Sequence, residues 1–122
     1  MSQRDKTVVV VEDQDDIRDL EAAILASMGY RVVLRERGEG LVGLVRQERP
    51  SLILLDLVLP DRHGNQVLMD LAADPVASRV PVVVVSAYPE QIRWAPPLRR
   101  VVPKPFDLED FERAVREAID DA

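Results

Sequence analysis

Five short runs of β-branched and aliphatic residues, separated by stretches with helical spacing, constrain the fold of this chain more than any other feature. The runs lie at Lys6–Val11, Arg31–Leu34, Leu52–Asp56, Pro81–Ser86 and Val101–Lys104. Apolar runs without polar alternation are typical of strands that are buried on both faces of a parallel sheet. Strands that alternate with helices predict an α/β fold, a doubly wound five-stranded parallel sheet in the flavodoxin-like order 2-1-3-4-5.

The stretches between these runs carry apolar residues at the spacing of amphipathic helices. Gly29 and Pro50 are predicted to end the first two helices, and Asp107 is predicted to cap the last one. The apolar positions are Ile17, Leu20, Ile24, Leu25 and Met28, then Leu41, Leu44 and Val45, then Val67, Leu68, Leu71 and Ala72, and finally Leu108, Phe111, Val115 and Ile119.

The segment Tyr88–Arg100 departs from this pattern, because its prolines interrupt helices. At most a short helix around Glu90–Trp94 is expected there, so the fourth helix of the fold is predicted to be shortened or irregular. Trp94 is predicted to pack back over the sheet, and the alternative is that it anchors a partner. Pro103 fits a strand only at a sheet edge, which is where the last strand is expected.

Length and composition narrow the class of protein. The chain is predicted to form one domain, residues 1–122. Its net charge of −6 argues against nucleic-acid binding, and the lack of cysteine excludes disulfides and thiolate metal sites. No signal peptide is evident, and no stretch approaches the ~20 apolar residues that span a bilayer. The chain is therefore expected to be cytoplasmic and to bind no membrane.

Polar residues mark the ends of four predicted strands. Glu12 and Asp13 follow the first strand, whereas Asp56, Ser86 and Lys104 end the third, fourth and fifth. Ligands of open α/β sheets bind beyond these strand ends, so the three carboxylates are expected to converge. Carboxylates that lie close together repel one another, and a hard divalent cation with oxygen ligands relieves that repulsion. The pattern favours a Mg²⁺ site.

Each residue also has a simpler interpretation. Glu12 and Asp13 precede a helix, where acidic residues often only complement the helix dipole. Ser86 fits a turn, and Lys104 alone fits a solvated surface lysine. Asp56 is harder to explain by packing, because it directly follows an apolar strand. The combination at one edge of one sheet favours a functional site.

Four motifs make this chain resemble the receiver domains of two-component response regulators. They are VVVED at 9–13, LLDLVLP at 54–60, VVSA at 84–87 and PKPF at 103–106. The resemblance implies that Asp56 accepts a phosphoryl group from a histidine kinase or a histidine phosphotransfer protein. It also implies a signalling domain that acts on an unknown downstream protein and catalyses only its own phosphorylation and dephosphorylation.

The same resemblance implies roles for the site residues. Asp13 and Asp56 would ligate Mg²⁺ directly, together with the backbone carbonyl of Val58, and Glu12 would hold a coordinated water. Ser86 would hydrogen-bond the phosphoryl oxygens and Lys104 would form an ion pair with them. The peptide bond between residues 104 and 105 is typically cis in this family.

Three features depart from the family pattern. Val101 stands where the family usually has a switching Tyr or Phe, so another readout route is expected. Tyr88 and the shortened fourth helix are similar to a stand-alone receiver subgroup, sometimes called FATGUY. Val58 and Tyr88 are not the small polar or acidic residues that help to orient a hydrolytic water in the family, which predicts slow self-dephosphorylation.

Two alternative functions fit the sequence less well. A haloacid-dehalogenase-like phosphatase needs a second Asp where Val58 stands. A pseudo-receiver that only docks partners remains an alternative. His63 is predicted to be a solvated loop residue, and Gly38, Gly40 and Gly43 form no phosphate-binding loop. The sequence does not identify the kinase, the output or the oligomeric state, nor whether the domain stands alone, serves a phosphorelay or is part of a longer chain.

Overall fold

A computed structural model describes residues 6–120 and shows one five-stranded parallel sheet in the order β2-β1-β3-β4-β5. The strands are β1 (Thr7–Val11), β2 (Arg31–Arg35), β3 (Leu52–Asp56), β4 (Val82–Ser86) and β5 (Leu98–Pro103). This order confirms the predicted doubly wound α/β fold. β3 and β4 are buried along their whole length, which explains their unbroken apolar sequences.

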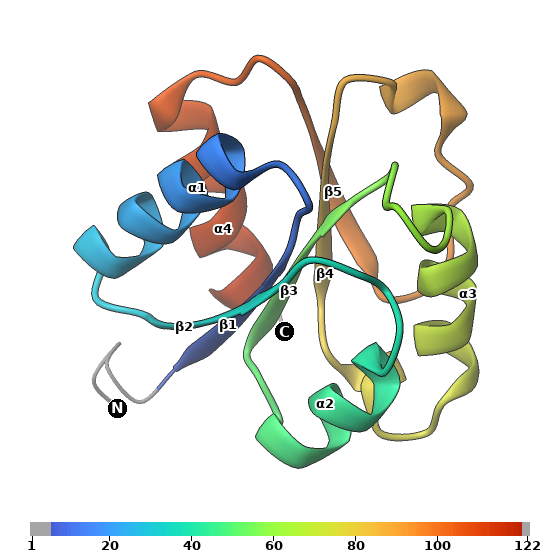
Figure 1. The fold of residues 1–122 in the computed structure, drawn as a ribbon. Coiled ribbons are helices and arrows are strands. Elements are labelled where there is room, and N and C mark those ends of the chain that lie inside the picture. The colour runs from blue at the N-terminus through green and yellow to red at the C-terminus, as the bar shows by residue number, and fades with distance from the viewer. Residues whose placement is uncertain (1–5, 121–122) are drawn as a thin grey trace.

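Two pairs of helices cover the sheet, one pair on each face (Figure 1). α1 (Asp15–Ser27) and α4 (Leu108–Asp120) pack on one face, and α2 (Leu41–Glu48) and α3 (Gly64–Ala73) pack on the other. Gly29 follows the end of α1 with φ 93°, a left-handed conformation that glycine adopts without strain. No helix within residues 6–120 has the length and apolar character needed to cross a membrane.

β5 lies at the sheet edge, as Pro103 required, but it begins three residues before the predicted start at Val101. Arg99 is an extra residue in this strand, because Val82 pairs with Leu98 and the next residue of β4 pairs with Arg100. Arg99 and Arg100 interrupt the apolar pattern, so the sequence did not predict the start of this strand. An exposed edge strand can carry such polar residues, whereas a strand buried on both faces cannot.

The connection between β4 and β5 contains only a single 3₁₀ turn, η3 (Pro89–Gln91), which confirms the expected irregular fourth helix. Residues 88–97, called here the strap, are fastened to the start of α3 by one side chain. The Asn65 amide donates to the Gln91 carbonyl (2.8 Å) and accepts from the Arg93 N–H (2.9 Å). Asn65 thus binds the strap as a paired backbone segment would.

The predicted packing of Trp94 over the sheet is wrong, because its side chain is 66% exposed. Two smaller residues of the strap, Ile92 and Ala95, are partly buried against the core instead. The extended backbone between them turns the indole outward.

We expect Asn65→Ala to loosen the strap without unfolding the sheet. Losing two hydrogen bonds of roughly 1 kcal/mol each should speed hydrogen exchange of the Arg93 amide by roughly tenfold or more. Asn65→Asp keeps the acceptor for Arg93 but loses the donor to Gln91, so its effect should be intermediate. Unchanged exchange in Asn65→Ala would show that the strap is held by other contacts.

Candidate functional site

The carboxyl ends of the strands bring three carboxylates together. Glu12 and Asp13 directly follow β1, and Asp56 is the last residue of the adjacent strand β3. One oxygen atom from each of the three lies within 4.8 Å of the others. Glu12 and Asp56 are buried and Asp13 is exposed, so the cluster is open to solvent on one side.

Lys104 reaches into this cluster from the end of β5. Its Nζ lies 2.5 Å from Glu12 Oε1 and 3.6 Å from Asp56 Oδ1. Burial lowers the pKa of Lys104, but the hydrogen bond to Glu12 and the charges of Asp56 and Glu12 raise that pKa above its usual value. The backbone N–H of Lys104 donates to the Ser86 carbonyl, and the Lys104–Pro105 peptide is cis, as the resemblance implied.

The donor set fits a hard divalent cation. Three carboxylates against one ammonium leave two negative charges at the strand ends, with oxygen atoms as the available ligands. Mg²⁺ prefers a few carboxylates completed by water and phosphate oxygens, which an open cluster of this kind accommodates.

A cavity of about 270 Å³ lies over Asp56. It is lined by Asp13, Gln14, Asp56, Val58, Ala87, Tyr88 and Lys104. The Val58 and Tyr88 side chains are each 49% exposed at this cavity. A phosphate-sized group placed against Asp56 would therefore meet carboxylates and an ammonium as well as the side chains of Val58, Ala87 and Tyr88.

Ser86 is buried at the end of β4 and does serve as a turn residue. Its Oγ accepts a hydrogen bond from the Tyr88 N–H (2.9 Å), the first residue of the strap. The hydroxyl hydrogen of Ser86 stays able to donate to another group. Ser86 can thus join a group in the cavity to the strap.

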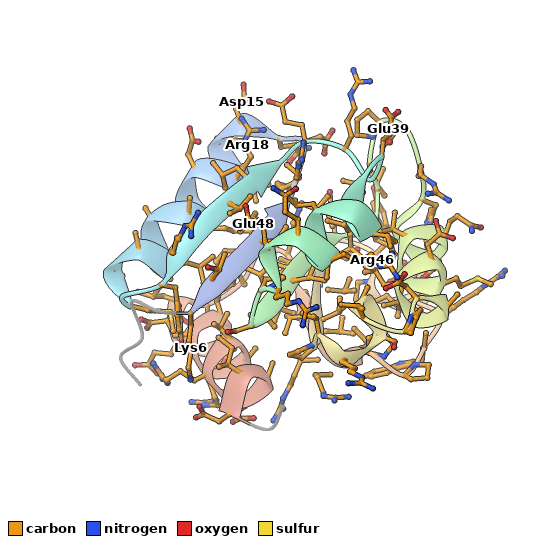
Figure 2. The ribbon with its side chains drawn as sticks, turned by 90° about the horizontal axis from the view of Figure 1, so that it is seen from below. Lys6, Asp15, Arg18, Glu39, Arg46 and Glu48 are labelled. Atoms are coloured by element: carbon orange, nitrogen blue, oxygen red, sulfur yellow. The ribbon has the colours of Figure 1, made fainter. Side chains whose placement is uncertain are left out.

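Arg18 fixes the loop between β1 and α1. Its guanidinium donates to the Glu12 carbonyl (3.3 Å) and to Asp15 Oδ1 (2.5 Å), and Figure 2 shows the Arg18 and Asp15 side chains together at the start of α1. It also lies 3.5 Å from Glu36, at the end of β2. The backbone that carries Glu12 is therefore tied to its surroundings.

Gly64 is a site residue that sequence reasoning missed. Its N–H donates to the Leu57 carbonyl (2.5 Å), and a Cβ at this position would lie 2.6 Å from Leu57 Cα and 2.7 Å from the Asp56 carbonyl oxygen. Only glycine permits this approach. His63, exposed as predicted, also caps α3, since its Nδ1 accepts from the Asn65 N–H (3.1 Å).

Glu21 is a second residue near the site that the sequence did not single out. It lies on the sheet-facing side of α1 and is 2% exposed. Burial, and then the charge of Glu12, raise the pKa of Glu21 to about 8, against a partial opposing effect of Lys104. Its place in the helical pattern, four residues after Ile17, was the signal that could have revealed it.

Comparisons with known proteins agree with this geometry. The family model described as "Response regulator receiver domain" matches residues 8–116. Protein PilH of Pseudomonas aeruginosa is 33% identical over 65% of this chain and 65% of its own length, just under two thirds. The polar-differentiation response regulator DivK of Brucella anthropi is 29% identical over 96% of this chain and 98% of its own.

A solved structure with a similar fold contains a metal ion. The receiver domain of the sensor histidine kinase PA1611 from Pseudomonas aeruginosa superposes with a TM-score of 0.84 at 26% identity. The match covers 94% of this chain and 98% of that domain, which has a magnesium ion coordinated in its active site cleft.

We expect the pH dependence of stability to reveal Glu21. In the unfolded chain its carboxyl loses its proton near pH ~4.3, whereas in the folded chain it keeps the proton until about pH 8. The unfolded state binds fewer protons between these values, so stability falls as pH rises through this window. Glu21→Gln should remove about 1–3 kcal/mol of that fall, measured by urea unfolding in EDTA from about pH 5 to about pH 8.

Asp19→Asn is the matched control, because Asp19 is an exposed carboxylate on the same helix. It should leave the pH dependence unchanged. Equal slopes for the wild type and Glu21→Gln would contradict the assignment of a buried, protonated carboxyl.

Proposed function

Because this chain belongs to the response regulator receiver domain family, we propose that it accepts a phosphoryl group on Asp56 from a histidine kinase or a histidine phosphotransfer protein. The observation that carries the proposal is the convergence of Asp56 with two other carboxylates and Lys104 at the base of one cavity. In the proposed transfer, an Asp56 carboxylate oxygen attacks phosphorus as the bond from phosphorus to the donor nitrogen breaks. The electron pair leaves with the imidazole.

Catalysis by such a site is positioning and charge neutralisation. Asp13 and Asp56, with the backbone carbonyl of Val58, would hold Mg²⁺, and Glu12 would hold a coordinated water. The cation supplies positive charge against the phosphoryl oxygens when it is bound. The magnesium in the PA1611 domain supports this assignment.

Lys104 would complete the neutralisation by exchanging partners. Its ammonium forms an ion pair with Glu12 and lies 3.6 Å from Asp56 Oδ1. A phosphoryl group on Asp56 adds about −1.5 to −2 charge, which would draw Lys104 away from Glu12. Ser86 would donate its free hydroxyl hydrogen to the same group.

Readout of phosphorylation would run through the strap rather than through an aromatic switch. Val101 is partly buried against the core and has no ring to swing. A shift of Ser86 toward a phosphoryl oxygen would move the Tyr88 N–H to which it is bonded. The signal would thus pass from the phosphorylated carboxylate into residues 88–97, and from there to a downstream protein.

Intact mass spectrometry after incubation with acetyl phosphate tests the acceptor. We expect one added phosphoryl group that requires Mg²⁺ and is absent in Asp56→Asn. It should persist in the control variant Asp70→Asn, whose carboxylate lies on α3 and pairs with Arg62. A phosphoryl group that survives in Asp56→Asn would place the acceptor elsewhere. No adduct from acetyl phosphate or from a phosphorylated histidine phosphotransfer protein would favour the pseudo-receiver.

The phosphoryl group is expected to hydrolyse slowly, over minutes or longer, because neither Val58 nor Tyr88 is a small polar or acidic residue that could orient a water at the cavity. Val58→Asn should shorten the half-life by roughly tenfold, whereas Val58→Ala should not. The measurement is the decay of the added mass after the donor is removed. A half-life of seconds in the wild type would contradict the assignment.

A further inference from the structure

The connection between β4 and β5 exposes a tryptophan between two arginines on an otherwise acidic chain. Trp94 is 66% exposed, and the exposed Arg93 directly precedes it. Arg99, the exposed second residue of β5, follows five positions later. Residues 89–100 contain three arginines and one glutamate, a net charge of +2 on a chain whose total is −6, so the remainder carries −8. Arg93, Trp94 and Arg99 are called here the Trp94 patch.

The patch is held on ordered backbone. Asn65 fastens the strap through Gln91 and Arg93, as described above, and Arg99 Nη1 donates to the Pro96 carbonyl (3.1 Å). That bond brings the Arg99 guanidinium to the turn that begins two residues after Trp94. A side chain presented this way loses little further freedom on binding, which lowers the cost of docking.

The charges of the patch are available to a partner. Among residues 6–120, no carboxylate forms an ion pair with Arg93 or Arg99, whereas Arg100 pairs with Glu117. Trp and Arg are the residues that most often dominate binding energy at protein interfaces. Here both types lie together on a surface that no described element covers.

We propose that the Trp94 patch docks an acidic segment of a partner protein. An apolar side chain of that segment would pack on the indole, and its carboxylates would pair with the guanidinium groups of Arg93 and Arg99. Charge complementarity selects this occupant, because the patch is basic while the rest of the chain is strongly acidic. The inference does not depend on phosphorylation of Asp56.

Two other occupants fit the charges less well. A two-fold dimer through the patch would place the same arginines against each other, which like-charge repulsion disfavours. An anionic membrane gains roughly 1 kcal/mol from each basic residue near its surface, and stable recruitment uses clusters of about four to eight. The patch offers two unpaired arginines, and the acidic remainder of the chain would be repelled.

Selection from a phage-displayed library of random peptides tests the proposal. We expect the enriched peptides to combine acidic residues with an aliphatic or aromatic residue. Synthetic copies should bind the full chain in calorimetry and shift the fluorescence of Trp94, which is the only tryptophan in the chain. Trp94→Ala and Arg93→Glu should each weaken calorimetric binding at least about tenfold.

Two controls match these variants. Met69→Ala removes an exposed apolar side chain elsewhere, and Arg79→Glu reverses an exposed arginine on another segment, so both should bind the peptides like the wild type. All four variants should still be phosphorylated by acetyl phosphate, which separates this proposal from the proposed function. The proposal is overturned if no peptide is enriched, if enriched peptides are basic, or if binding survives Trp94→Ala and Arg93→Glu.

Two direct assays address the rival occupants. Vesicles that contain phosphatidylserine should not shift Trp94 fluorescence, and sedimentation should show no self-association that depends on Trp94. A positive result in either assay would replace the acidic partner with a membrane or a second copy.

Discussion

Repulsion among three carboxylates is the constraint on which the site depends. Glu12, Asp13 and Asp56 are brought together by the ends of two adjacent strands, and two of them are buried. Charges in such a place are tolerated only when they are paired or coordinated. Lys104 pairs with Glu12, and the neighbouring Glu21 carboxyl keeps its proton, so no further negative charge is added. A divalent cation would balance the remaining negative charge of the carboxylates before a phosphoryl group adds to it.

The surroundings of this cluster are arranged around the same strand ends. Ser86 directly precedes Ala87, which lines the cavity, and it accepts a hydrogen bond from the Tyr88 N–H of the strap. Asn65 joins the strap to α3, which begins against the end of β3 at Gly64. The strap therefore contacts the site through two routes, although it contains no α-helix. A short, tethered segment with few alternative conformations is well suited to respond to a small movement of one hydroxyl group.

The sequence predicted the parts of this structure that follow from local pattern. Unbroken apolar runs predicted the buried strands, because a strand covered by helices on both faces is apolar at nearly every position, and their alternation with helices predicted a parallel, doubly wound sheet. Two predictions failed because tertiary contacts decided the outcome. For Trp94, Ile92 packs against the core in place of the indole. For the start of β5, the strand contains Arg99 as an extra residue at the sheet edge. Gly64 needed three-dimensional distances, since its close approach to Leu57 does not follow from spacing. Spacing could place Glu21 on the buried side of α1, but it could not show that Glu21 neighbours Glu12.

The ion pair between Lys104 and Glu12 determines the stage of folding at which the site can be complete. Its partners are separated by 92 positions, and Lys104 is delivered by the strand farthest along the chain. Contacts between residues this far apart tend to form late in folding, because the entropic cost of closing the long intervening loop must first be met. No partly folded form that lacks β5 can assemble the charges around Asp56. Competence for the proposed phosphoryl transfer is therefore expected to appear only once the sheet is complete.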